Sequence, residues 1–243
     1  MSISLVIPAY NEEKQIGECL DAVLKNAPGK FFEIIVVDNA STDKTKEVAL
    51  QRKGVRVVYE PNKGLTHARE CGRLASSGDL IAYIDADTRM PVGWVDKVEK
   101  VFRTSPDVVA LSGPSHFFDS TAWQNFVLIF LWWLTAPLAY RITGYMIYGA
   151  HFVAKREALQ AIGGFDKNIR FYGEDTDIAK RLSKQGKVMF RMDFLIYTSA
   201  RRFQHAGFLK TNFIYMMNFI WPVLFDKPFG GEYRDVRPES ISK

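Results

Sequence analysis

The sequence is poor in cysteine and lacks the glycine-rich loops that hold phosphates. Only two of its 243 residues are cysteines, Cys19 and Cys71, and they do not form a metal-binding pair. We therefore expect reduced or buried thiols and a cytosolic setting rather than a disulfide framework. The patterns G-x-G-x-x-G and G-x-x-x-x-G-K-[ST] are both absent, which argues against a dinucleotide-binding loop and an ATPase loop. A bound nucleotide would have to be held by side chains and a metal.

The chain also lacks a long basic run, a low-complexity tract and a leader pattern. Its net charge of +5 suits a nucleotide or an anionic lipid surface, and without a basic tract we expect no nucleic acid partner. The N-terminus has no basic start and no cleavage site after its short apolar run, so we expect a first strand there and not a signal peptide. With 47% hydrophobic residues and no linker, residues 1–243 are expected to form a single domain.

Apolar runs of strand length alternate with helical patterns through the first half of the chain. Runs that are apolar throughout predict strands buried on both faces, and the amphipathic segments between them predict helices. We expect strands at 3–7, 33–37, 55–59, 79–84 and 108–112. We expect helices at 12–26, 65–76 and 92–103, and another that is capped by Ser41 or Thr42 and ends at Gly54. The alternation predicts an α/β fold with a Rossmann-like, mostly parallel sheet flanked by helices.

Polar residues follow three of the expected strands at the point where each strand ends. The segments are "PAYNEE" after the first strand, "DNASTD" after the second and "DADT" after the fourth. Ligands of open α/β sheets bind outside the carboxyl ends of the strands. We therefore expect Tyr10, Asp38, Asp85 and Asp87 to gather at one edge of the sheet and to form a site there.

Asp85 and Asp87 form a D-x-D pair within the stretch "LIAYIDADTR". A single pair of this kind is equally well interpreted as a solvated turn. At the ligand-binding edge, however, two carboxylates can share a divalent cation, and Mg²⁺ typically takes one or two carboxylates together with substrate phosphates. In that interpretation Tyr10 can stack on a nucleotide base, and Asp38 can accept hydrogen bonds from it.

A second acidic group, Glu174 and Asp175, stands at the start of an expected helix in "GEDTDIAKRL". Acidic residues in a first helical turn are favoured by the helix dipole, so one interpretation is structural. The functional interpretation is a general base that takes a proton from a hydroxyl group.

The second half of the chain contains 21 consecutive uncharged residues, 120–140, and an aromatic-rich end. The first run is long enough to span a bilayer, but a single crossing would separate Asp85 from Asp175. We therefore expect either a re-entrant hairpin bent at Pro137 or a helix lying flat. Aromatic residues suit a membrane interface, and we expect membrane contact through 120–140 and 208–225. The alternatives are packing on the domain itself and a homo-oligomer interface.

Six segments of the chain together resemble a family-2 inverting glycosyltransferase of the GT-A fold. They occur in the order and spacing of that family and cover residues 3–190: "LVIPAYNEE", "IIVVDNASTDKT", "NKGLTHARECG", "GDLIAYIDADTR", "REALQAIGGFD" and "GEDTDIAKRL". The resemblance implies transfer of a sugar from a nucleoside-diphosphate sugar, with UDP favoured before GDP or dTDP, to a hydroxyl acceptor such as a sugar or a lipid-linked sugar. Together with the aromatic, uncharged segments and the two cysteines, this function leads us to expect a cytoplasmic enzyme that is peripheral or monotopic at the inner face of the cell membrane.

The resemblance also implies roles for individual residues. The donor pocket would contain Pro8, Ala9, Tyr10, Glu12, Asp38, Arg69, Asp85 and Arg202, with Asp38 and Arg69 at the base. Mn²⁺ or Mg²⁺ would be bound by Asp87, with Asp85 and His205 as further candidates, and the catalytic base would be Asp175 with Glu174 beside it. Residues 1–115 would form the nucleotide-binding half, 116–200 the acceptor and catalytic half, and 201–243 a C-terminal amphipathic segment.

The chain departs from processive members of this family, which carry a Q-x-x-R-W motif. The corresponding region reads "TSARRFQHAG", so we expect a non-processive enzyme in which Arg201, Arg202 and His205 can close over the diphosphate. His205 is equally consistent with a surface histidine. His151 fits either a place near the donor sugar or a packed strand histidine. Two other functions stay open: a catalytically silent nucleotide-sugar-binding subunit, and a nucleotidyltransferase, although the latter needs a basic glycine-rich loop where "PAYNEE" is acidic.

Overall fold

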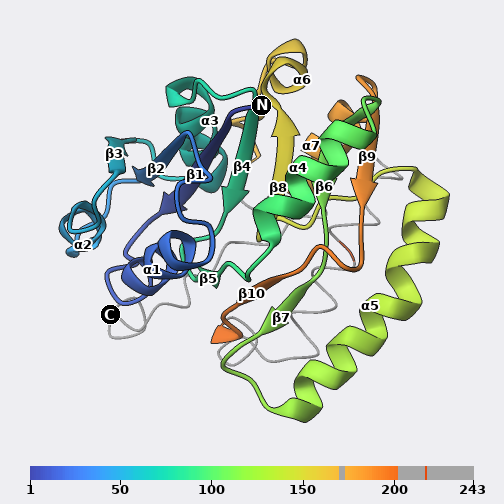
Figure 1. Cartoon of the computed structure of the whole chain (residues 1–243), viewed down its shortest axis with the longest axis horizontal. Helices are drawn as coiled ribbons and strands as arrows, with labels where there is room; N and C mark the ends of the chain where they lie inside the picture. The colour runs from blue at the N-terminus through green and yellow to red at the C-terminus, as the bar shows by residue number, and fades with distance from the viewer. Residues whose placement is uncertain (170–172, 202–216, 218–243) are drawn as a thin grey trace.

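A seven-stranded sheet forms the centre of the computed structural model, which describes residues 1–169, 173–201 and 217 (Figure 1). The strand order is β3-β2-β1-β4-β8-β6-β9. The strands are β1 (Ile3–Ala9), β2 (Glu33–Asp38), β3 (Val55–Tyr59), β4 (Leu80–Ile84), β6 (Val108–Ser112), β8 (His151–Lys155) and β9 (Lys187–Phe190). The α/β architecture expected from the sequence is therefore confirmed.

The sheet is mostly parallel, with one strand reversed near its middle. Strand β1 pairs in parallel with β2 and β4, whereas β8 runs antiparallel to both β4 and β6. Because of this reversal, the start of β8 lies at the end of β4, where His151 is paired with Ile84. The residues just before β8 therefore reach the edge at which β4 delivers its acids.

A second sheet of three short strands was not expected from the sequence. It consists of β5 (Thr88–Arg89), β7 (Ser115–Phe117) and β10 (Ile196–Thr198), with β10 in the middle. Strand β10 is antiparallel to β5, so that Thr198 pairs with Thr88. This pairing brings the residues after β10 next to the "DADT" turn.

Helices cover both faces of the main sheet. They are α1 (Ile16–Asn26), α2 (Thr45–Leu50), α3 (Leu65–Ala75), α4 (Trp94–Thr104), α6 (Arg156–Ala161) and α7 (Glu174–Leu182). Alternate residues of β1 face opposite sides: Leu5 packs in the core with α1 and α4, and Val6 in the core with α3 and α7. The strand is therefore apolar throughout because neither of its faces meets water.

The second helix does not have the N-cap that the sequence predicted. Helix α2 begins at Thr45, without a side-chain cap. Ser41 and Thr42 instead bind the loop after β1: the Ser41 hydroxyl accepts from the backbone N–H of Asn11 at 3.1 Å, and the Thr42 N–H donates to the Asn11 side-chain oxygen at 2.8 Å. Their polar groups are used to join the two loops at the carboxyl edge, which is why they are not available to the helix.

Residues 122–140 of the uncharged run lie in one continuous helix, α5 (Ala122–Thr143), with Pro137 inside it. The expected hairpin bent at Pro137 is therefore wrong, whereas a helix lying flat on a membrane stays a prediction. Figure 1 shows α5 at the periphery, beyond β9. By length and composition it is the one helix among the described residues that can cross a bilayer.

Helix α5 is attached to the domain by a single stripe of side chains. The stripe is made by Asn125, which binds the backbone of Phe117, by the buried Leu128 and Ala136, by Trp132, which stacks on Phe190, and by Tyr140, which donates to the carbonyl of Val188. These positions recur every three or four residues, as on one face of a helix. The other faces expose Trp123, Phe126, Phe130, Trp133, Leu134, Leu138 and Ile142.

We predict that Gly72→Ala destabilises the protein, because Gly72 is where α3 approaches β1. A Cβ atom at Gly72 would lie 2.2 Å from Cγ1 of Val6, and overpacking of this kind costs about 1–3 kcal/mol. Urea unfolding would measure the loss. In the double variant with Val6→Ala, the combined loss should be smaller than the sum of the two single losses. Additive losses would show that the two residues do not press on each other.

Candidate active site

The backbone fixes the turn that carries Asp85 and Asp87. The N–H of Asp85 donates to the carbonyl of Ala150 at 3.1 Å. The carbonyl of Asp85 accepts from the hydroxyl of Thr88 at 2.8 Å and from its N–H at 3.2 Å. Both carboxylates are therefore held at the carboxyl edge of the main sheet, where the sequence placed them.

A buried arginine from α3 links the two acidic groups. Arg69 is 1% exposed, and its guanidinium donates to the carbonyl of Gly149 at 2.6 Å. The same guanidinium lies 3.4 Å from a carboxylate oxygen of Asp85 and 3.3 Å from one of Glu174. These contacts link the acidic residues of the site. The position beside the nucleotide base, which was expected for Arg69 together with Asp38, stays a prediction.

The acidic pair of α7 surrounds a glycine that the sequence did not single out. A Cβ atom at Gly149 would lie 3.4 Å from a carboxylate oxygen of Glu174, 3.5 Å from one of Asp175 and 3.6 Å from Nη2 of Arg69. The backbone of Gly149 also hydrogen-bonds the Asp175 carboxylate. Nothing in "IYGAH" distinguishes this glycine from a turn glycine, because its importance depends on the reversal of β8.

The environment separates the protonation states of Glu174 and Asp175. Burial, and then the charge of Asp175, raises the pKa of Glu174 to about 8. Burial also raises the pKa of Asp175, but Arg69 and backbone hydrogen bonds oppose that rise. At neutral pH Glu174 therefore keeps its proton. The contacts of Arg69 and of the backbone favour the ionised form of Asp175, which makes Asp175 the candidate for a general base.

Tyr148 is a further residue of the site that the sequence did not indicate. Burial, together with the nearby carboxylates of Asp85, Asp87 and Asp175, raises the pKa of its phenol to about 12. Its ring meets Trp132 of α5 edge-on, with centroids 5.3 Å apart. Tyr148 thus lies between the acids and the peripheral helix.

The residues expected at the nucleotide lie at the ends of β1 and β2. Pro8 and Ala9 belong to β1, and Ala9 pairs with Asp38, the last residue of β2. Tyr10 follows directly, and its hydroxyl accepts a hydrogen bond from Lys63 at 2.9 Å. Tyr10 and Asp38 therefore emerge side by side, as expected for the carboxyl ends of parallel strands.

Asn39 organises the neighbouring loop and was overlooked in the sequence. Its side-chain nitrogen donates to the carbonyls of Glu60 and Asn62, at 3.1 and 2.7 Å. Its oxygen accepts from the N–H of Gly64 at 2.8 Å. Since Gly64 immediately precedes α3, this amide helps to set the start of the helix that carries Arg69.

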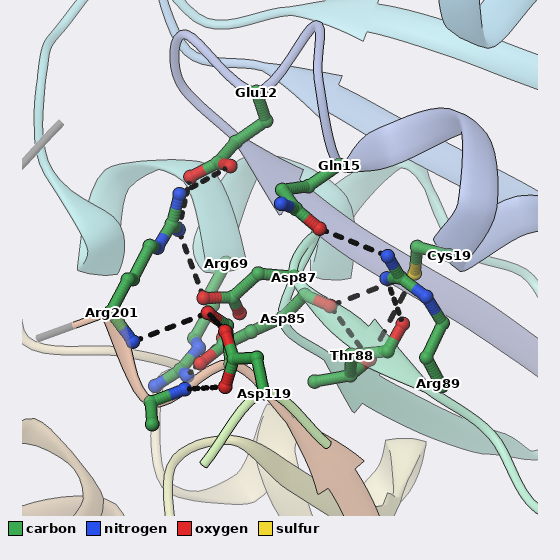
Figure 2. A network of polar contacts seen from close by, with 12 residues as sticks. Glu12, Gln15, Cys19, Arg69, Asp85, Asp87, Thr88, Arg89, Asp119 and Arg201 are labelled. Carbon is green, nitrogen blue, oxygen red and sulfur yellow. Dashed lines mark hydrogen bonds and ion pairs between the residues drawn. The ribbon is translucent and has the colours of Figure 1, made fainter. Parts of the chain in front are cut away.

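A second arginine joins the loop after β1 to the "DADT" turn (Figure 2). The guanidinium of Arg201 forms a two-pronged ion pair with Glu12, at 2.6 and 2.8 Å, and lies 3.0 Å from Asp87. Glu12, expected in the donor pocket, is 4% exposed. Arg202 and His205, which the sequence also placed near the diphosphate, lie outside the described residues.

His151 is packed in the core and does not face the site. Its Nε2 atom lies 3.0 Å from the carbonyl of Gly113 and 3.2 Å from that of Pro114, and its Nδ1 atom accepts from the indole of Trp94 at 3.4 Å. Burial lowers the pKa of the imidazole to about 4. Of the two interpretations of His151, the packed strand histidine is the one that agrees with these contacts.

The donor set at the "DADT" turn fits a hard divalent cation. Asp85 and Asp87 supply carboxylate oxygens, with side chains 35% and 13% exposed. Within residues 1–169 and 173–201 no three His, Cys, Asp or Glu side chains gather into a set that would hold a metal alone. A cation here would complete its shell with phosphate oxygens, which is how Mg²⁺ is commonly held.

The fold and the site define a class of proteins, the glycosyltransferases of the GT-A fold. A mannosyltransferase from Pyrobaculum calidifontis, solved with GDP-Man and Mn²⁺, aligns over 93% of this chain and 64% of its own, with a TM-score of 0.69 and 21% identity. Glucosyl-3-phosphoglycerate synthase from Mycobacterium tuberculosis, solved with Mg²⁺ and UDP, aligns over 90% of this chain and 78% of its own, with a TM-score of 0.62 and 20% identity.

The particular family follows from the sequence itself. The model "Glycosyl transferase family 2" matches residues 4–163, and the model "N-terminal domain of galactosyltransferase" matches residues 134–206. The chain therefore belongs to glycosyltransferase family 2, as its six segments indicated. Membership of this family of enzymes argues against the alternatives of a silent binding subunit and a nucleotidyltransferase.

Curated relatives match part of the chain at about one-third identity. Glycosyltransferase AglE of Haloferax volcanii is 34% identical over 114 residues, which is 44% of this chain and 38% of the relative. Glycosyltransferase GlyG of Streptococcus pneumoniae is 33% identical over 113 residues, or 44% of this chain and 37% of the relative. The match thus spans well under half the length of these relatives.

We predict that stability falls as the pH rises through the titration of Glu174. Its pKa is about 8 in the folded chain, against 4.5 for the ordinary group. Between these values the folded state holds a proton that the unfolded state has released, so the free energy of unfolding falls by up to about 1.4 kcal/mol per pH unit. Urea unfolding from pH 5 to 8 would measure this slope, and Glu174→Gln should remove it. An equal slope in both proteins would contradict the raised pKa.

Proposed function

We propose that the chain transfers a sugar, with inversion, from a nucleoside-diphosphate sugar to a hydroxyl group of a lipid-linked acceptor at a membrane surface. One observation carries the proposal: Arg69 contacts Asp85 of the D-x-D pair and Glu174 of the α7 pair, and both acids of the α7 pair lie next to Gly149. A candidate cation-binding group and a candidate base are thereby held close to each other. An inverting single displacement needs one of these at the leaving group and the other at the nucleophile.

In the proposed reaction Asp175 takes the proton of the acceptor hydroxyl. The hydroxyl oxygen then bonds to the anomeric carbon on one face of the sugar as the bond from that carbon to the diphosphate oxygen breaks on the other face. A divalent cation held by Asp87 and Asp85 neutralises charge on the leaving diphosphate when bound. Arg201, next to Asp87, adds positive charge at the same place.

UDP is the donor nucleotide that we propose. Among solved structures of this fold, TarS from S. aureus is described in complex with UDP-GlcNAc and the glucosyl-3-phosphoglycerate synthase with UDP, whereas the mannosyltransferase holds GDP-Man. Thermal-shift measurements with UDP, GDP and dTDP sugars, each with Mn²⁺, would test the assignment. A larger stabilisation by a GDP sugar than by every UDP sugar would overturn it.

The membrane part of the proposal is supported by α5. A helix that is apolar all round is normally buried, in a core or in lipid, yet among the described residues of α5 only Leu128 and Ala136 are buried. Both ends of α5 lead into strands of one domain, β7 before it and β8 after it. The helix therefore fits a surface on which it lies flat, and a cytoplasmic enzyme at the inner face of the membrane fits the reduced cysteines.

A lipid-linked acceptor is consistent with this placement. One relative, 34% identical over 115 residues from Edwardsiella ictaluri, is named an undecaprenyl-phosphate 4-deoxy-4-formamido-L-arabinose transferase. Trp132 of α5 also contacts Tyr148, which precedes β8 beside the acidic residues of the site. An acceptor whose lipid stays in the bilayer could thus present its hydroxyl beside α5.

We predict that Asp175→Asn abolishes transfer and leaves donor binding within about twofold. Loss of a general base typically costs 10²- to 10⁴-fold in turnover. Glu174→Gln is the matched control, because glutamine imitates the protonated carboxyl that Glu174 carries at neutral pH, and it should cost less than tenfold. Turnover and donor affinity would be measured with the nucleotide sugar selected by thermal shift. The reverse ranking of the two variants would assign the base to Glu174.

We predict that Leu134→Glu weakens binding to lipid vesicles at least tenfold. Leu134 on α5 is 63% exposed, and a charge there would have to enter the interface. Leu74 on α3 is similarly exposed, at 67%, so Leu74→Glu is the matched control and should bind as the unchanged protein does. Flotation with phosphatidylcholine and phosphatidylglycerol vesicles would measure both. A detergent-free protein that stays off vesicles, or dimerises through α5, would contradict the membrane proposal.

A further inference from the structure

The position of Arg201 is set by several contacts that do not involve its own side chain. The backbone N–H of Ser199 donates to the carbonyl of Asp87 at 3.2 Å. Asp119 accepts from the hydroxyl of Ser199 and from the N–H of Ala200, at 2.5 and 2.6 Å, and the N–H of Arg201 donates to the same hydroxyl at 3.2 Å (Figure 2). The segment 199–201 is thus anchored to the "DADT" turn, and the guanidinium is directed to the site by the fold.

The guanidinium of Arg201 neutralises two acids with one charge. Glu12, 4% exposed, receives both prongs of the guanidinium, and Asp87, with a side chain 13% exposed, receives one contact at 3.0 Å. The contact to Glu12 is the stronger of the two, because a two-pronged carboxylate pair has better geometry than a single one. The contact to Asp87 is therefore the one that a competing cation can replace.

We propose that Arg201 competes with the divalent cation for Asp87, and that cation binding releases Arg201 to the donor diphosphate while Glu12 continues to hold it. The inference rests on the proposed function, because it needs a cation at Asp87. A divalent ion on this carboxylate would lie within a few ångströms of the guanidinium, and like charges at that distance repel strongly in a partly buried site. The positive charge of Arg201 is thus kept beside the cation site and becomes available when the cation arrives.

This competition predicts that cation and diphosphate bind cooperatively. Without a diphosphate, the cation must displace Arg201 from Asp87, and no phosphate oxygen is present to replace that contact. With a diphosphate present, the released guanidinium binds the phosphate oxygens. Each ligand therefore increases the affinity of the protein for the other. By thermodynamic linkage, the factor of increase is the same for both ligands.

The test measures Mn²⁺ alone and does not depend on turnover. Free Mn²⁺ is followed by electron paramagnetic resonance as it is titrated into the full-length protein, first alone and then with inorganic pyrophosphate. We expect Arg201→Ala to bind Mn²⁺ alone about three- to tenfold more tightly, and to bind pyrophosphate in the presence of Mn²⁺ at least tenfold more weakly. Misfolding would weaken the binding of both Mn²⁺ and pyrophosphate. Tighter Mn²⁺ binding together with weaker pyrophosphate binding therefore identifies the competition.

Two control variants separate the possible outcomes. Arg191→Ala removes the same charge from an exposed pair with Asp193 and should leave Mn²⁺ affinity within twofold, whereas Asp87→Asn should abolish Mn²⁺ binding. If Arg201→Ala leaves the affinity for Mn²⁺ alone unchanged or weaker while Asp87→Asn abolishes it, the competition is wrong and the metal role stands. If neither the unchanged protein nor any of the variants binds Mn²⁺, both the competition and the proposed metal-assisted reaction are wrong.

Discussion

The guanidinium of Arg69 is the group on which the rest of the site depends. Buried carboxylates cannot gather around one point without a compensating charge, since their desolvation and mutual repulsion would exceed what packing supplies. Arg69, fully enclosed on α3, contacts Asp85 and Glu174 and lowers the pKa of Asp175 against the effect of burial. It thereby joins two acidic groups that are about 90 residues apart in the chain, and its charge favours the ionised form of Asp175.

The reversal of β8 makes this arrangement possible. An antiparallel strand between β4 and β6 begins where β4 ends, so the segment Tyr148–Ala150 lies against the D-x-D turn. Its backbone accepts from Arg69 and from the N–H of Asp85, and hydrogen-bonds Asp175. The same segment follows α5, so one connection joins the peripheral helix to the acids. The small sheet has a similar effect on the other side, where β10 delivers Arg201 to Asp87.

Much of the first half was predictable because its signals are local. Apolar runs and amphipathic segments identified the strands and helices to within a few residues, and the rule for ligand sites in parallel sheets placed Tyr10, Asp38 and the D-x-D pair at one edge. The cap of α2 was wrong because Ser41 and Thr42 bind Asn11 across the loop instead. Gly149, Tyr148 and Asn39 were missed because each acts through partners distant in sequence.

The sequence alone determined the family, the alternation of strands and helices in the first half, the acids of the site and the apolar character of 120–140. Each of these features follows from residue types and from spacings of a few residues along the chain. Only the tertiary structure decided that the run forms one helix held by one stripe, that β8 is reversed, and that Arg69 and Arg201 each serve acids from different segments. These features depend on strand direction and on charges that meet across long stretches of chain. Local spacing carries no information about either, because burial and ion pairing are established only when the sheet has assembled.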